Sequence, residues 1–314
     1  MSRIANLPCV WGVCLLLVLP EVVLAAESGS GTWSAWVWMV LLFATTFVIG
    51  VFGVMAGIGG GVLFVPLVSG FFPFHIDFVR GAGLFIALGS SLAAAPYLLR
   101  QNLASLRLAM PVALIASAFS IVGAQLGLWI SALNPAYIQG ALGVVILGIA
   151  MIMLRTPIRV FPVVSGNDPV AKWLGLQGWF VEETTGERMN WTVHRAAVGL
   201  SGFVLVGLLA GIFGLGAGWA NVPLLNLVMG APLKIAVATS SFSLSITDTT
   251  AAWVYFNRGA VLPALVVPSL VGVMLGAMLG SRMLPHVPAF MIRRLVIGVL
   301  MLAGIRSVLK AVDW

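Results

Sequence analysis

Two clusters of glycine have the residue type and spacing best suited to binding chemistry in this sequence. Each cluster interrupts a long apolar stretch and is followed by a proline, Pro66 in the first case and Pro223 in the second. A helix that breaks at such a point exposes backbone N–H groups of partial positive charge, and glycine lets an oxyanion approach them closely. We therefore predict that the two breaks bind one anion. The residues assigned to this part of the site are Gly57, Gly59, Gly60, Gly61, Gly214, Gly216, Gly218 and Asn221.

Close helix packing is the alternative explanation for glycine clusters, because small residues also let membrane helices approach one another. For two pairs of glycines spaced by four residues, packing is the better interpretation. These pairs are Gly123 with Gly127 and Gly276 with Gly280.

Hydroxyl side chains gather in the long apolar segment 235–256 of the second half, and the first half offers only Ser90 and Ser91 at roughly corresponding places. A hydroxyl can donate to a sulfonate-like or carboxylate oxygen without the cost of burying a full charge. The alternative is that the hydroxyl bonds a carbonyl of its own helix. The hydroxyls assigned to the substrate site are Ser90, Ser91, Thr239, Ser240 and Ser241.

Asp248 is an acid within an apolar segment. A charged Asp at the centre of a membrane helix costs about 2.5–3.5 kcal/mol on insertion scales. A partner, a water-filled cavity or a proton must offset that cost, so Asp248 is the candidate coupling residue. A purely structural role is the alternative, and the coupling ion, proton or sodium, stays open at this stage.

The remaining charged and imidazole side chains predict no further site. Arg80 and Lys234 begin equivalent segments in the two halves, and we expect them to snorkel at helix ends, where they could also attract an anion. His75, His194 and His286 lie far apart in the sequence, and we predict no metal site. The chain also lacks a phosphate-binding loop, and we predict no cofactor.

The amino-acid composition predicts that these residues belong to a membrane protein. Of 314 residues, 61% are hydrophobic and only 8% are charged, against roughly 25% charged in a soluble domain. Such a chain cannot cover a globule with polar surface, which excludes a soluble enzyme, a nucleic-acid binder and a disordered protein. The basic residues stand singly between apolar stretches, so they mark topology and do not form a nucleic-acid surface.

Hydrophobic segments predict an all-α polytopic membrane bundle. A spanning helix needs about 20 apolar residues, and eight segments reach that length while two are too short. The long segments are 36–56, 79–99, 108–130, 137–154, 193–213, 235–256, 260–281 and 290–308, and the short ones are 62–72 and 219–229.

An internal duplication relates the two halves of the chain. The motif that starts at Gly57 recurs at Gly214 with an offset of 157 residues, and Val-Pro-Leu recurs whole within it. Each half holds five segments. If all five cross the bilayer, the odd number inverts the second copy, which is a recurring plan of transporters with a binding site at the bilayer midplane. If the short segments are re-entrant, the two copies are parallel; we favour inversion.

The two repeats are predicted at 33–154 and 193–311, with a polar loop at 155–192 between them. By the positive-inside rule this loop and the loop containing Arg100 and Arg107 face the cytoplasm, and the uncharged turn at 131–135 faces outside. Residues 1–26 combine a basic start, a short apolar run and a small-residue end, which predicts a signal peptide. An uncleaved first helix is the alternative.

The doubled motif resembles the TauE/SafE sulfite-exporter family of membrane permeases. The resemblance rests on Gly57-Ile58-Gly59-Gly60-Gly61 with Val65-Pro66 and on Gly214 to Gly218 with Val222-Pro223, and it runs from about Val40 to Leu309. It implies a secondary transporter of the inner (plasma) membrane that carries a small sulfur-containing anion such as sulfite or an organosulfonate. It also implies transport without ATP.

Two other classes of function remain. One is a permease for a different small solute, such as a carboxylate or an amino acid. The other is a membrane-embedded enzyme or assembly factor, which would require a Ser–His pair or paired acids within the spans; Asp248 stands alone there. The sequence also allows a homodimer.

Overall fold

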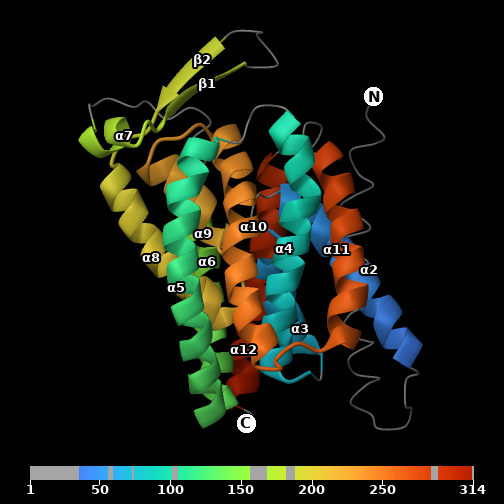
Figure 1. Cartoon of the computed structure of the whole chain (residues 1–314). Helices are drawn as coiled ribbons and strands as arrows, with labels where there is room; N and C mark the ends of the chain where they lie inside the picture. The colour runs from blue at the N-terminus through green and yellow to red at the C-terminus, as the bar shows by residue number, and fades with distance from the viewer. Residues whose placement is uncertain are drawn as a thin grey trace.

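The computed structural model describes residues 35–55, 59–72, 74–100, 105–155, 168–181, 188–283 and 289–312. They form a bundle of long helices with a small hairpin at one end (Figure 1). Six of the helices are long and apolar enough to cross a membrane. The predicted all-α polytopic bundle is therefore confirmed. The predicted signal peptide at 1–26 lies outside the described residues.

The ten predicted segments appear as helices whose ends differ from the expected ones by a few residues. The first five are α2 Ala35–Met55, α3 Gly61–Phe71, α4 Ile76–Arg100, α5 Leu106–Leu133 and α6 Pro135–Arg155. The second five are α8 Ala196–Phe213, α9 Gly218–Pro223 continued by the π-helix η1 Leu224–Val228, α10 Leu233–Asn257, α11 Pro263–Met283 and α12 Ala289–Val312.

Between the two sets lie a short helix and two strands. They are α7 Pro169–Trp173, β1 Gln177–Val181 and β2 Arg188–Thr192, and the strands pair antiparallel. We call the end of the bundle that carries these elements the hairpin end and the opposite end, where α5 turns into α6, the far end (Figure 1). The C-terminus of α4 and the N-termini of α5 and α8 also lie at the hairpin end.

Proline and glycine set several helix ends. α8 ends at Gly214, whose φ of 66° is left-handed, a conformation that glycine adopts without steric cost. Pro223 ends α9, and the chain continues as a π-helix. Proline lacks the N–H group that a regular α-helix would use at that position. Each half therefore contains a short helix preceded by a glycine-rich break.

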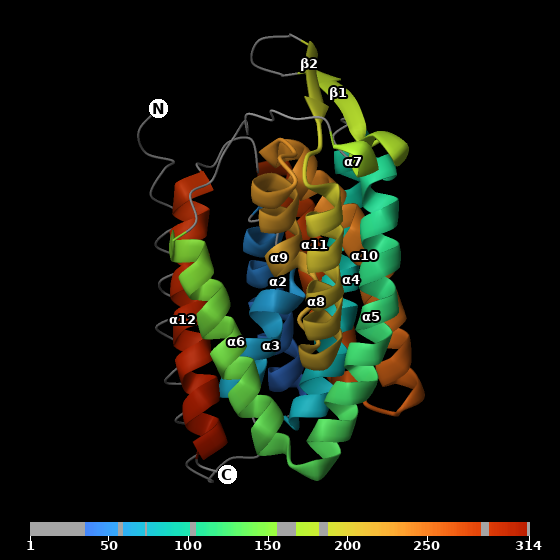
Figure 2. The same ribbon diagram turned by 90° about the vertical axis from the view of Figure 1, so that its left-hand side faces the viewer.

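Helices of the two halves pack against each other in matched pairs. α2 packs on α11 as α5 packs on α8, while α4 packs on α10 and α6 on α12 (Figures 1 and 2). The glycine pairs lie in the first two contacts: a Cβ on Gly123 would collide with the carbonyl of Leu208, and one on Gly276 with that of Phe47. The packing interpretation of these pairs is confirmed.

Large apolar side chains cover the outer surface of the bundle. Trp129, Val144 and Trp253 are each more than 60% exposed, whereas the polar side chains Ser90, Asn221 and Asp248 are fully buried. An apolar exterior, with these polar side chains confined to the interior, is the arrangement expected of a protein embedded in lipid.

Candidate functional site

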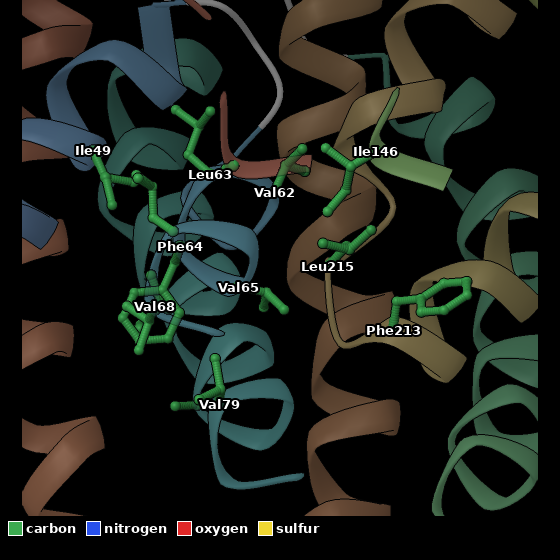
Figure 3. Packing of buried hydrophobic residues seen from close by; sticks show 14 of the residues in the cluster. Ile49, Val62, Leu63, Phe64, Val65, Val68, Val79, Ile146, Phe213 and Leu215 are labelled. Carbon is green, nitrogen blue, oxygen red and sulfur yellow. The ribbon is translucent and has the colours of Figure 1, made fainter. Parts of the chain in front are cut away.

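The two glycine-rich breaks touch each other inside the bundle. We call Gly59–Gly61 the first break and Gly214–Gly218 the second break. A Cβ on Gly61 would lie 2.8 Å from the carbonyl oxygen of Leu215 in the second break. Figure 3 shows the first residues of α3, including Val62 and Val65, gathered with Leu215 from the second break and Ile146 from α6. The predicted convergence of the two breaks is thus present; Gly57 lies outside the described residues.

The backbone of both breaks requires glycine. Gly59, Gly214 and Gly216 have φ angles of 74°, 66° and 73°, in the region where an L side chain costs about 1–2 kcal/mol. A Cβ on Gly214 would also collide with the backbone of Arg80 on α4. Gly218 begins α9 and is buried. These glycines therefore permit both the turn of the chain and its close approach to α4.

Ser90 joins α4 to the first break. The N–H of Gly60 donates to Oγ of Ser90 at 3.0 Å, and the Ser90 hydroxyl donates to the carbonyl of Ala87 at 2.9 Å. The adjacent Ser91 donates to Leu88 of its own helix at 2.9 Å. Of the two first-half hydroxyls predicted at the site, Ser90 therefore contacts it and Ser91 bonds its own backbone.

The three second-half hydroxyls behave differently from one another. Thr239 accepts a bond from the N–H of Ser105, at 3.2 Å. Ser241 donates to the carbonyl of Val237, at 3.1 Å. Ser240 is fully buried, and its hydroxyl has no hydrogen-bond partner among the described residues. Of these three hydroxyls, that of Ser240 alone is unpaired within the described part of the chain.

Asp248 lies against the second break. A Cβ on Gly216 would sit 3.0 and 3.2 Å from its two carboxylate oxygens. Asp248 is fully buried, and neither oxygen accepts a hydrogen bond of normal geometry from a described residue, although the amide of Ala217 is close enough to interact electrostatically. No described cation pairs with it. The carboxylate therefore lacks the partners that normally compensate a buried charge.

Two further buried groups near Asp248 are also unsatisfied. Asn221 is fully buried on α9, one turn beyond Ala217, and neither its amide nitrogen nor its amide oxygen has a described partner. The hydroxyl of Thr247, next to Asp248 on α10, is in the same state. Buried polar atoms are nearly always paired in folded proteins. We call Asn221, Ser240, Thr247 and Asp248 the unpaired polar group.

Arg80 corrects one prediction. It does not snorkel at a helix end but is fully buried. Its guanidinium donates to Asp77 at 2.7 Å, to the carbonyl of Ile212 and to the hydroxyl of Tyr255, over whose ring it lies at 5.2 Å. The C-terminal carbonyls of α8 have no partner within their helix, and these carbonyls together with Asp77 compensate the buried charge. Its counterpart Lys234 is exposed, as expected.

The arrangement favours a site that opens and closes. Because the two breaks are in van der Waals contact, an anion can lie between them only after they separate. The unpaired polar group would then gain partners from the solute or its water. The sequence analysis did not assign Thr247, Asp77 or Tyr255 to a site. The spacing of Asp77 and Arg80, three residues apart on one helix, is a signal that could have suggested their ion pair.

Comparison with known proteins agrees with this architecture. A protein of Bacillus subtilis (strain 168), named "Probable membrane transporter protein YunE", is 26% identical over 254 residues, which cover 78% of this chain and 89% of the relative. No solved structure matches the chain. The model of the family described as sulfite exporter TauE/SafE matches residues 42–307, which include both breaks. The chain therefore belongs to the TauE/SafE sulfite exporter family of multi-pass membrane permeases, a family of transporters and not of enzymes.

Proposed function

We propose that this permease carries a small sulfur-containing anion, such as sulfite or an organosulfonate, by secondary transport. The anion binds near the bilayer midplane, between the first break and the second break. The observation that carries this proposal is the unpaired polar group beside two touching glycine breaks. Membership of the sulfite exporter family supports the choice of anion.

The proposal includes inversion of the second repeat. α4 runs toward the hairpin end and its counterpart α10 runs away from it, and α5 and α11 are likewise opposed (Figure 1). The matched packing of α2 on α11 and of α5 on α8 also fits a two-fold relation in the membrane plane. Such a relation lets the two halves exchange roles, so that the site faces each side of the membrane in turn.

Asp248 is the coupling residue in this proposal. An unpaired carboxylate in this interior would repel an anion at the neighbouring break, and a proton removes that repulsion. Binding of proton and anion at adjacent places then makes their passage interdependent, because each lowers the cost of burying the other. The hairpin end faces the cytoplasm, as its basic flanking residues favour.

Counterflow in proteoliposomes tests the proposed function. Purified protein is reconstituted with one unlabelled solute inside, either sulfite, sulfoacetate, taurine or acetate, and uptake of the same solute in labelled form is followed. The other solutes are then added outside as competitors. We expect sulfite or sulfoacetate to exchange and acetate to compete weakly. Exchange of acetate alone would favour a carboxylate permease, and exchange of none of the four would contradict the proposal.

A further inference from the structure

A groove lies between α5 and α10 on the outside of the bundle, with both apolar and polar side chains along it. It has a volume of about 510 Å³, and Gln125, Thr249, Thr250, Asn257 and Arg258 contribute to its lining, with Trp253 beside them. Asn257 and Arg258 close α10 at the far end. Polar groups along a lipid-facing surface are costly unless water reaches them, so we consider the groove as a water-filled entry from the far end.

Hydroxyls continue from the groove into the bundle. Thr250 lines the groove, and its Oγ1 lies 3.1 Å from Oγ of Ser120 on α5. Ser120 is fully buried and lies 3.4 Å from the carbonyl oxygen of Thr247. The Thr247 hydroxyl is buried and unpaired, and Asp248 follows it in the sequence. Ser120 and Thr250 thus join α5 to α10 beside the groove, and the hydroxyl of Thr247, the residue before Asp248, has no partner among the described residues.

The more direct way from Asp248 to the far end is closed. Tyr255 lies two turns farther along the same face of α10. It is fully buried beneath the guanidinium of Arg80, and its hydroxyl donates to the carbonyl of Gly211 at 3.1 Å. Helices α4, α8 and α10 are therefore joined below Asp248, and this contact leaves the lateral hydroxyls as the polar connection.

We propose that Thr250, Ser120 and Thr247 form a route by which protons from the far end reach Asp248 through the groove between α5 and α10. The route rests on the proposed function, because it supplies the coupling ion of that transporter. Each hydroxyl accepts one proton and passes on another, so the proton that forms the O–H bond on Asp248 is balanced by one lost from water in the groove. Water completes the gap between the Thr247 hydroxyl and its neighbours.

A proton fits this route better than a metal cation does. A hard cation needs several oxygen ligands at once, whereas the described residues hold no group of three or more His, Cys, Asp or Glu side chains that could bind one. No charged group on a packed element pairs with Asp248 either. The titratable and charged side chains of α10 and of the described parts of the helices against it are Asp77, Arg80, Arg107, Arg195, Lys234, Tyr255 and Arg258.

Proton flux measured separately from anion exchange tests the route. Proteoliposomes loaded with a pH-sensitive dye receive a sulfite gradient, and the internal pH change is recorded for S120A and T250V. We expect the anion-driven proton flux to fall about tenfold in both, because each loses one link of a hydrogen-bonded chain, while sulfite counterflow stays near the wild-type rate. The matched control is T249V. The Thr249 hydroxyl lines the same groove and donates to Ser245 of its own helix, whereas the Thr250 hydroxyl, which donates to Thr247 of its own helix at 2.8 Å, also contacts Ser120 of α5.

The outcomes separate the two proposals. Wild-type proton flux in both S120A and T250V would overturn the route and leave the transporter intact. Absence of sulfite counterflow in the wild-type protein would instead remove the proposed function. If S120A fails to fold, cysteine labelling replaces that measurement. In a protein with Cys9 and Cys14 changed to serine, we expect T250C to react with a small charged thiosulfonate added at the far end. A T250C protein that stays unlabelled would overturn the route.

Discussion

At the scale of single residues, the interior holds polar atoms that its own packing leaves unsatisfied. Asn221, Ser240, Thr247 and Asp248 are fully buried, and atoms of each have no described partner. An unmade hydrogen bond costs about 1–3 kcal/mol for each buried group. In the proposed transporter, a bound solute and its water would supply partners for these atoms.

Substitution of Asp248 by asparagine should separate exchange from coupling. The amide has the shape of the carboxyl group but cannot exchange a proton, so D248N should retain sulfite counterflow and lose the dependence of net uptake on a pH gradient. Uptake is measured with and without that gradient. The control is D168N, which lies outside the bundle interior. A D248N protein whose net uptake still follows the gradient would remove the coupling role.

Gly216 should not tolerate even a methyl group. Its φ of 73° costs an alanine about 1–2 kcal/mol, and the new Cβ would sit 3.0 Å from Asp248 and from the Cβ of Ala87. We expect G216A to lower sulfite counterflow about tenfold, the change that 1.4 kcal/mol makes. G148A is the matched control, since a Cβ there meets nothing within 4 Å. Equal rates for G216A and wild type would mean that the second break does not form the site.

At the scale of the elements, the sequence predicted what depends on local pattern. The apolar lengths gave the ten helical segments, and glycine beside proline gave both breaks. The burial of Arg80 was missed because its partners come from elsewhere in the chain: the end of α8 and Tyr255 on α10 lie more than a hundred residues away. The sequence around Arg80 does not indicate which backbone carbonyls at the end of a distant helix will lack hydrogen-bond partners.

The start of α8 offers a test by pH at the hairpin end. Asp168 accepts hydrogen bonds from the N–H groups of Ala196, Val170 and Ala171. The bond from Ala196 is the main cause that lowers the pKa of this carboxyl below 3.8. The pKa of Asp168 is lower in the folded protein than in the unfolded one. The carboxylate therefore contributes its full stabilisation above pH 3.8, and this stabilisation is lost as the pH falls through the folded pKa.

Thermal unfolding in detergent measures this effect. At neutral pH, D168A should lose about 1 kcal/mol, the usual value of a helix cap. The difference in stability between D168A and wild type should become smaller at pH values well below 3.8. D168N keeps an oxygen acceptor without a titrating charge, so its capping contribution should not depend on pH. A gap between D168A and wild type that stays constant down to acid pH would contradict the assignment.

At the scale of the whole molecule, the site exists because the halves interleave. α2 packs on α11 and α5 on α8, and the short helix α3 of the first half packs on α12 of the second. The duplication in the sequence predicted that two breaks exist, and chemistry suggested that they converge. Their direct contact, and therefore the closed state of the site, depends on how four helices of both halves pack, which no local pattern encodes.

The most direct test of the central claim is the location of a bound anion. Selenite has the shape and charge of sulfite, and its selenium scatters anomalously, so crystals grown with selenite would show where the anion binds. We predict an anomalous peak between the first break and the second break, which separate to admit it, close to Asn221 and Asp248. A peak elsewhere in the protein, with Gly61 still packed against Leu215, would contradict the account.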